Sequence, residues 1–365
     1  MKNLDTLQKY LVEEFYDDYR EGLISRRQFI RRLAYITGSM AATVSTMSLL
    51  GCSPSELPDP TEPIPPPEPT ATTPPPEPAA TTPPEPTATT PPDPTATTAP
   101  EPTEEAAAEP TAEPAAQLEP VPGAQSPFSV PEGDPAVISD RVTFTSQGDE
   151  ITAYQARPAA DGVYPAILVC HENRGLNPHI EDVARRFAKE GYVALALDLL
   201  AREGGTATHD RDEVPGLLTN AGADRHVADF VAGFDYLQGL DYVDGERIGL
   251  TGYCFGGGIT WRVATALPEL KAAVPFYGPA PDLEQVPNIN AAVLGVYAEQ
   301  DERINAGIES LEQALMDAGI THQINIYPGV NHAFHNDTGE RYVEEQATQA
   351  WQDTLAWFEE HLRQT

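Results

Sequence analysis

The stretch RIGLTGYCFGGG, residues 247–258, decides the fold. Its first half is apolar, as expected of a buried β-strand, and its second half is a glycine-rich segment where a helix can begin. Gly252, Cys254 and Gly256 fit the pattern Gly-x-nucleophile-x-Gly, which places a reactive side chain on a strained strand-to-helix turn with small neighbours. The helix N-terminus that follows favours a thiolate. The pattern predicts a nucleophilic Cys254; a small core cysteine beside helix-packing glycines is the alternative.

Segments with strand and helix patterns alternate on both sides of this stretch. Continuous apolar runs predict parallel strands buried on both faces, and period-two alternation predicts an antiparallel hairpin before them. The predicted hairpin spans 141–157, the buried strands 165–172, 192–200, 247–253, 271–278 and 291–299, and a weaker edge strand 322–329. Amphipathic helices are predicted at 179–191, 223–238, 304–318 and 341–363. This alternation predicts one α/β domain over residues 126–365, with a mostly parallel sheet and helices on both faces.

Two polar residues follow later predicted strands, at the edge where open α/β sheets place their sites. Asp301 comes after the fifth buried run, and His332 follows the last predicted strand. The chain order nucleophile, acid, histidine is that of triads in α/β hydrolases. We expect His332 to take the proton of the Cys254 thiol, while Asp301 orients the imidazole ring and stabilises its charged form. Glu299 is an alternative acid and His335 an alternative base, although we assign His335 a flanking or structural role.

The first third of the chain differs in composition from the rest. Of the 37 prolines, 24 precede residue 126, and residues 53–125 contain no Lys or Arg. A segment so poor in apolar residues cannot bury enough surface to offset the entropy lost on ordering, so we predict a disordered Pro-rich linker there. The formal net charge of −34 argues against nucleic acid as a partner, because phosphate binding needs a basic face.

Residues 1–52 carry features of an export signal. SRRQFIRR at 25–32 precedes a moderately apolar stretch with many small residues, as in twin-arginine signals. The stretch ends in LLGC at 49–52, which resembles a bacterial lipobox, so Cys52 is the predicted lipidation site. An uncleaved membrane helix is the alternative, but residues 33–50 are marginally short for spanning. We therefore expect an exported protein, anchored by Cys52 to the outer face of the cytoplasmic membrane.

Four motifs together indicate a family. GYCFGGG at 252–258, YAEQDERI at 297–304, GVNHAFHND at 329–337 and VCHENRGLN at 169–177 closely resemble the dienelactone hydrolase (carboxymethylenebutenolidase) family. The resemblance covers nearly all of residues 138–363. It implies an α/β hydrolase with a Cys-His-Asp triad, monomeric, without metal or cofactor, that acts on small lactones and esters.

The resemblance also implies roles for further residues. Glu172 matches the family's glutamate that contacts the nucleophilic cysteine and helps to generate its thiolate. The backbone amides of Phe255 and Asn173 match the oxyanion hole. Arg202 matches one of two arginines that hold the carboxylate of dienelactone. Asn336 stands where the second arginine is expected, four residues after the histidine, and this departure puts dienelactone itself in doubt as the substrate.

The sequence thus predicts a surface-anchored, cysteine-dependent hydrolase of small esters or lactones. One alternative is a general carboxylesterase or thioesterase on larger extracellular esters, and another is a catalytically silent binding module on a stalk. Cys170 lies on a predicted buried strand and is expected to pack as a small hydrophobic residue rather than to form a disulfide with Cys254. No metal site is predicted, because the histidines fit no recurrent zinc spacing.

Overall fold

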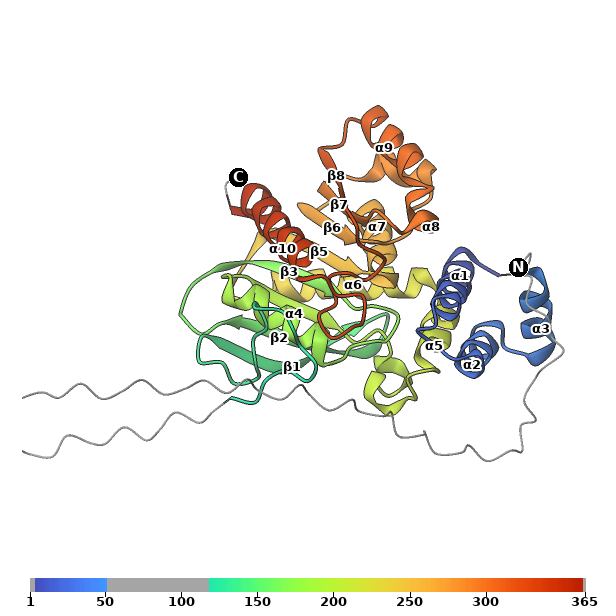
Figure 1. The fold of residues 1–365 in the computed structure, drawn as a ribbon. Helices are drawn as coiled ribbons and strands as arrows, with labels where there is room; N and C mark the ends of the chain where they lie inside the picture. Colours follow the sequence, from blue (N-terminus) through green and yellow to red (C-terminus); the bar gives the residue numbers. More distant parts are fainter. Residues whose placement is uncertain (1–3, 51–117, 364–365) are drawn as a thin grey trace, which may run out of the picture. The chain divides into compact units, whose positions relative to one another are not determined.

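An eight-stranded sheet forms the centre of the α/β domain (Figure 1). The computed structural model describes residues 4–50 and 118–363. The strands are β1 (Val137–Ser146), β2 (Asp149–Pro158), β3 (Tyr164–Cys170), β4 (Val193–Leu197), β5 (Val243–Tyr253), β6 (Ala272–Phe276), β7 (Ala292–Ala298) and β8 (His322–Tyr327). They lie in the order β1-β2-β4-β3-β5-β6-β7-β8. Strand β2 is antiparallel to both of its neighbours, β1 and β4, and all other neighbouring strands are parallel.

Burial explains the strand patterns. Every residue of β4, β6 and β7 is buried, as the continuous apolar runs predicted, because helices cover both faces of a parallel sheet. The edge strand β8 is only partly buried, which matches its weaker pattern. Gln147 and Gly148, both with positive φ, form the two-residue turn between β1 and β2. The predicted hairpin, the parallel sheet and the α/β class are confirmed.

Helices lie on both sides of the sheet (Figure 1). They are α4 (Pro178–Lys189), α5 (Val214–Ala221), α6 (Ala223–Gln238), α7 (Phe255–Ala266), α8 (Glu302–Asn305), α9 (Ile308–Asp317) and α10 (Glu344–Phe358). Helices α4 and α10 share an aromatic cluster in which Phe187 contacts Trp351 and Phe358, with ring centroids 4.6 and 6.0 Å apart. Helix α6 packs against α7 and against β1 and β5.

Two helices differ from the sequence prediction at their ends. The segment 304–318 forms two helices instead of one, because Asp301 caps α8 through the backbone N–H of Ile304, and the chain turns at Gly307 before α9. The last predicted helix begins at Glu344 rather than at 341, and its end, Glu359–Arg363, is a π-helical turn. Neither difference changes the positions of the strand ends that carry the site.

Residues 4–50 form three helices, α1 (Thr6–Arg20), α2 (Arg26–Thr37) and α3 (Met40–Leu49). Capping boxes start α1 at Asp5 and α2 at Ser25, and Gly38 ends α2 in the left-handed conformation. The apolar side chains of α1 belong to the same core as the α/β domain, with Leu11 and Val12 fully buried. Helix α1 was not predicted from the sequence.

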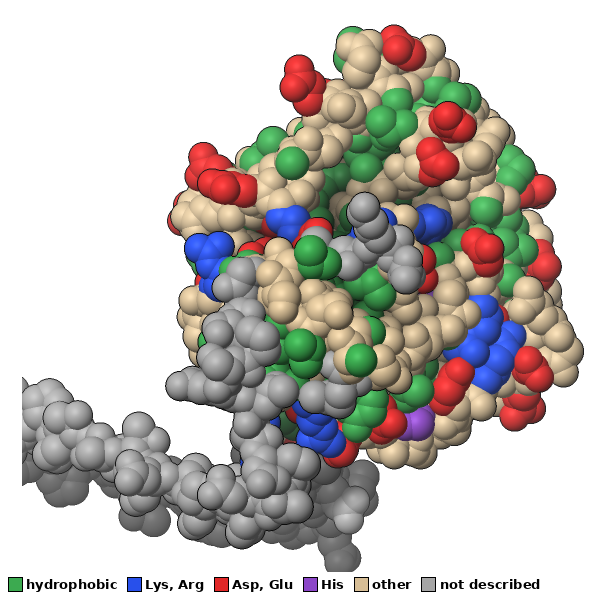
Figure 2. All heavy atoms as spheres, turned by 90° about the vertical axis from the view of Figure 1, so that its right-hand side faces the viewer, with side chains coloured by type: hydrophobic (Ala, Val, Ile, Leu, Met, Phe, Trp, Pro, Cys, Tyr) green, Lys and Arg blue, Asp and Glu red, His purple; other side chains and the backbone are tan. Residues whose placement is uncertain are grey.

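The face of the molecule on the side of α1–α3 mixes hydrophobic, acidic and basic side chains (Figure 2). The burial of Leu11, Val12 and Phe15 in the common core shows that α1 turns its apolar residues towards the α/β domain. Among the described residues, no helix combines the length and the apolar character needed to cross a bilayer.

Cys52 and most of the predicted linker lie outside the described residues. The predicted linker bound of 125 is wrong for residues 118–125, which contact the domain, since Val121 is buried and the Gln125 N–H donates to the Asp337 carbonyl.

Candidate active site

Cys254 sits at the turn between β5 and α7 in a strained backbone conformation. Its φ and ψ are 57° and −118°, which non-glycine residues rarely adopt. The Cys254 N–H donates to the carbonyl of Phe276, while its own carbonyl accepts from Gly257 and Gly258 and so begins α7. A Cβ on Gly256 would collide with the carbonyl of His171, which explains why only glycine fits there. The structure therefore forms the turn that the Gly-x-Cys-x-Gly pattern predicted.

His332 and Asp301 lie beside this turn, as predicted from their positions after strands. The Nδ1 atom of His332 is 2.6 Å from Oδ2 of Asp301, and both side chains are buried. Burial opposes a charge on His332, but Asp301 and Glu14 outweigh it and raise the pKa of the imidazole. A ring nitrogen of His332 lies within 4.8 Å of the Cys254 sulfur, and its Nε2 atom has no hydrogen-bond partner among the described residues. It is placed to exchange a proton with that thiol.

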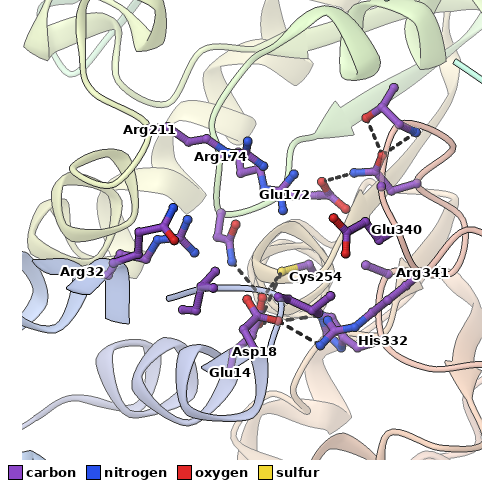
Figure 3. Close-up of a pocket in the computed structure, with 18 residues that line it drawn as sticks. Glu14, Asp18, Arg32, Glu172, Arg174, Arg211, Cys254, His332, Glu340 and Arg341 are labelled. Carbon is purple, nitrogen blue, oxygen red and sulfur yellow. Dashed lines mark hydrogen bonds and ion pairs between the residues drawn. The ribbon is translucent and has the colours of Figure 1, made fainter. Parts of the chain in front are cut away.

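Glu14, from α1, contacts the thiol directly (Figure 3). The Cys254 Sγ–H donates to Oε1 of Glu14 at 3.2 Å, and the Asn173 side-chain amide donates to the same oxygen at 2.8 Å. The Tyr10 hydroxyl lies 3.3 Å from Sγ. Burial, and then the charges of Glu14 and Glu172, raise the pKa of the Cys254 thiol well above its usual range. In this arrangement the thiol is protonated. Sequence spacing could not reveal Glu14, which lies 240 residues before its partner.

Glu172 lines the same cavity but has a different partner from the one that the family resemblance implies. Its Oε2 atom accepts a 2.6 Å hydrogen bond from the Asn336 side-chain amide. The other amide atom of Asn336, Oδ1, accepts from the backbone N–H and the hydroxyl of Thr338. Asn336, at the position where an arginine was expected, thus holds Glu172. The carboxylate that accepts from the Cys254 thiol is Glu14 instead.

The cavity beside Cys254 is lined by other arginines than Arg202, the one that the resemblance implies. Arg202 pairs with Asp149 and Asp229, each at 2.7 Å, and does not line the cavity beside Cys254. Its side chain is held by these two carboxylates, so its position does not support a role in substrate binding. Arg174 and Arg211 line the cavity instead, and their proximity shows in the pKa of Arg211, which the charge of Arg174 and then burial lower.

The two predicted oxyanion-hole residues lie next to the thiol. The N–H of Phe255, at the start of α7, is directed at the Cys254 sulfur, where it favours negative charge. Asn173 lines the cavity with Cys254, and its side-chain amide is taken by Glu14. The cavity lined by Cys254 and Asn173 has a volume of about 310 Å³, which suits a small organic substrate.

Glu299 and His335, the alternative acid and base, and Cys170 have structural roles outside the triad. Glu299 accepts the Gly329 N–H on the surface and does not reach His332. His335 stacks on Tyr253, and burial lowers its pKa to about 3, so it stays neutral in the core. Cys170 is a buried free thiol on β3, as predicted.

A metal ion could be held by three of these groups. One ligand atom each from Glu14, Cys254 and His332 lie within 4.8 Å of one another. Thiolate, imidazole and carboxylate are the ligands that zinc prefers, and Asp301 would orient the histidine from behind. A metal would compete for these atoms with the thiol proton and with the hydrogen bond that now joins Cys254 to Glu14.

Known proteins match the α/β part of the chain. The family model of the dienelactone hydrolase family matches residues 151–362. A Salmonella typhi protein named "Putative carboxymethylenebutenolidase" is 36% identical over 251 residues, covering 65% of this chain and 92% of its own length. An Escherichia coli protein of the same name is 35% identical over 243 residues, covering 62% and 89%.

A solved structure agrees with these relatives. The crystal structure of a "Putative Dienelactone Hydrolase" from Klebsiella pneumoniae is 37% identical with a TM-score of 0.57, and the match covers 61% of this chain and 98% of that one. Helices α1–α3 lie before the part of the chain that the family model matches. The match includes the turn with Cys254 and the strand ends with Asp301 and His332. The chain belongs to the dienelactone hydrolase family of α/β hydrolases.

Proposed function

We propose that the protein hydrolyses small carboxylic esters or lactones through Cys254. One observation carries the proposal: the cysteine stands on a strained strand-to-helix turn, in a cavity shared with a histidine that is paired with a buried aspartate. This set provides a nucleophile, a base and a group that orients the base. The proposed residues are Cys254, His332 and Asp301.

The proposed reaction has two steps that balance in atoms and charge. Nε2 of His332 takes the Sγ proton, and the thiolate attacks the carbonyl carbon while the amides of Phe255 and Asn173 stabilise the oxyanion. The alcohol leaves with the proton from His332, and a thioester with Cys254 remains. Water, deprotonated by His332, then attacks the thioester, releasing the acid and restoring the thiol. For a lactone the first step opens the ring, the alcohol stays attached to the acyl group throughout, and the second step releases a single hydroxy acid.

The cavity favours a substrate with a negatively charged group. Arg174 and Arg211 line it together, and neither guanidinium lies within ion-pair distance of a carboxylate in the described parts of the chain, although the charges of Asp212 and Glu172 offset part of the effect of Arg174 on Arg211. An anion between them would relieve their mutual repulsion and form charge-assisted hydrogen bonds. We therefore propose an ester or lactone with a carboxylate near its reactive carbonyl, held by Arg174 and Arg211 rather than by Arg202. A general carboxylesterase or thioesterase is the second candidate, supported by the position of Arg202 outside the cavity.

Two matched substrates test this proposal. p-Nitrophenyl acetate and mono-p-nitrophenyl succinate share a leaving group and differ by a carboxymethyl group on the acyl part, and dienelactone serves as a third substrate. We expect hydrolysis that Cys254→Ala abolishes, with a preference for the succinate. Arg211→Gln should lower kcat/KM for the succinate about 10–100-fold, the value of one charged hydrogen bond, and leave the acetate unchanged. Equal turnover by the parent and Cys254→Ala would refute the thiol mechanism, and no turnover of any substrate, either by the full chain or after removal of residues 1–52, would favour a binding module.

We also propose export and anchoring through Cys52. The proposal is supported by the paired arginines at 26–27 and by the LLGC sequence at 49–52. Mass analysis of the mature N-terminus from a bacterial host tests it. A lipid-modified Cys52 at the new N-terminus is the expected result, and an intact residue 1 or an unmodified Cys52 would refute anchoring.

A further inference from the structure

Helix α1 reaches the reactive sulfur from outside the family's domain. The family model begins at residue 151, yet Tyr10 and Glu14 of α1 are the side chains that contact Cys254 Sγ, at 3.3 and 3.2 Å. Helix α2 packs against α5 of the α/β domain, and Arg32 pairs with Asp212 at 2.9 Å. Cys254 is 2% exposed with these helices in place. The nucleophile is therefore covered by a segment that the matched part of the family does not contain.

Charged groups around the cavity hold α1 in this position. Arg303 of α8 lies 3.8 Å from Glu14 and 3.3 Å from Asp17. Arg341 pairs with Asp18 at 2.9 Å and with Glu21 at 2.7 Å. The acidic residues of α1 and of its C-cap, Glu21, thus pair with basic residues of the α/β domain. This complementarity explains the acidic sequence before residue 25, which an export signal does not require.

The carboxylate of Glu14 occupies the place that the reaction needs. We call this place the acyl site, the space over Cys254 Sγ between the Asn173 side chain and His332. One carboxylate oxygen accepts from Sγ–H and from Asn173, and the other lies 3.7 Å from Nε2 of His332. A carboxylate on an alkyl stem is also what ester hydrolysis leaves in such a site. Glu14 thus resembles a bound product acid, supplied by the chain itself.

The same contact opposes formation of the nucleophile. A thiolate at Cys254 would face the negative charge of Glu14 at 3.2 Å in a buried site. Glu14 also lies 3.7 Å from Nε2 of His332, so its carboxylate stands between the thiol and the nitrogen that would accept the thiol proton. Steric exclusion of substrate and electrostatic suppression of the thiolate therefore act in the same direction.

We infer that residues 4–50 are an intramolecular inhibitor, in which Glu14 fills the acyl site and substrate enters only after α1 has left. The inference rests on the proposed function, since it names the regulation of that site. The proposed cleavage before Cys52 would remove the whole segment. Export processing would then activate the enzyme outside the membrane and keep it silent inside the cell. A free carboxylic acid should compete with α1 for the same site.

Two full-length proteins test this inference. In the first, a site-specific protease sequence is inserted between residues 53 and 117, and the folded protein is cleaved before assay. In the second, Glu14→Ala removes the carboxylate, and Glu13→Ala removes the same charge from the neighbouring position as the matched control. All three proteins carry Cys52→Ser, and a chelator is present so that no metal bridges the site. Iodoacetamide labelling of Cys254, located by peptide mass analysis, and p-nitrophenyl acetate hydrolysis are measured in parallel.

We expect Glu14→Ala and cleavage each to raise both rates at least about tenfold, while Glu13→Ala leaves them unchanged. If Glu14→Ala unfolds the protein in thermal melts, the cleaved parent protein carries the test. Faster labelling without ester hydrolysis would support the inhibitor and refute the proposed function. If the parent protein already hydrolyses the ester and neither change alters the labelling rate, the inhibitory role of residues 4–50 is refuted, while the proposed ester hydrolysis stands. Slower hydrolysis after Glu14→Ala would also overturn the inference, because Glu14 would then assist the reaction.

Discussion

Replacement of Asp301 by asparagine probes the pair that prepares the base. Asp301 accepts a 2.6 Å hydrogen bond from Nδ1 of His332 in a buried site. Burial lowers the pKa of His332, and the charge of Asp301 raises it. The asparagine side chain in Asp301→Asn has nearly the same shape, but its amide group can donate to Nδ1. His332 would then carry its proton on Nε2, the atom that must accept the thiol proton.

The expected magnitude follows from these two losses. A charge-assisted hydrogen bond contributes about 1.5–3 kcal/mol, and the wrong tautomer adds a loss of similar size. Together they amount to about 3–6 kcal/mol, which corresponds to a decrease in kcat/KM of about 10²–10⁴-fold. The measurement is p-nitrophenyl acetate hydrolysis by Asp301→Asn in a Glu14→Ala background, against Glu14→Ala alone. Thermal melts confirm that both fold. A decrease of less than about fivefold would contradict the role assigned to Asp301.

Three other predictions concern stability. Arg186 forms buried ion pairs with Asp182 and Asp337, and Arg186→Met takes the guanidinium away from both carboxylates. This variant should lower the free energy of urea unfolding by about 3–5 kcal/mol, and no loss would show that the ion pairs make no net contribution to stability. Gly256→Ala forces a methyl group against the His171 carbonyl and should cost about 1–3 kcal/mol or abolish folding, as urea titration will show; parent stability would contradict the tight turn. Burial lowers the pKa of His335 to about 3 and of His226 to about 4, so in acid the unfolded chain binds protons that the native protein does not. The free energy of unfolding should therefore fall as the pH falls from about 6.5 to 4, by about 1.4 kcal/mol per pH unit for each histidine. His335→Phe should reduce that slope, and an unchanged slope would place the protonation elsewhere.

The strands and the elbow were predictable because their signals are local. Continuous apolar runs identified β3 to β7, and Gly252, Cys254 and Gly256 identified the turn between β5 and α7. The positions of Asp301 and His332 followed from a general property of parallel sheets, whose strand ends meet at one edge. These features depend on neighbours in sequence or on the rules of the fold.

The remaining parts of the site depend on contacts between distant segments. Glu14 reaches Cys254 across 240 residues, and nothing in the spacing of either residue marks that contact. Arg202 matched a motif, but two carboxylates on separate elements, those of Asp149 and Asp229, determine where its guanidinium lies. Asn336 was noted as a missing arginine, whereas its structural role is to hold Glu172. Side-chain partners of this kind follow from packing, which a single sequence does not specify.

The most direct test of the central claim is detection of the acyl-enzyme. The full-length protein with Glu14→Ala is mixed with p-nitrophenyl acetate, quenched in acid within the first turnover and digested for peptide mass analysis. The account predicts one added acetyl group on the peptide that contains Cys254, and none in the Cys254→Ala variant. Rapid ester hydrolysis without any acetylated Cys254 peptide, or acetylation confined to another residue, would contradict it.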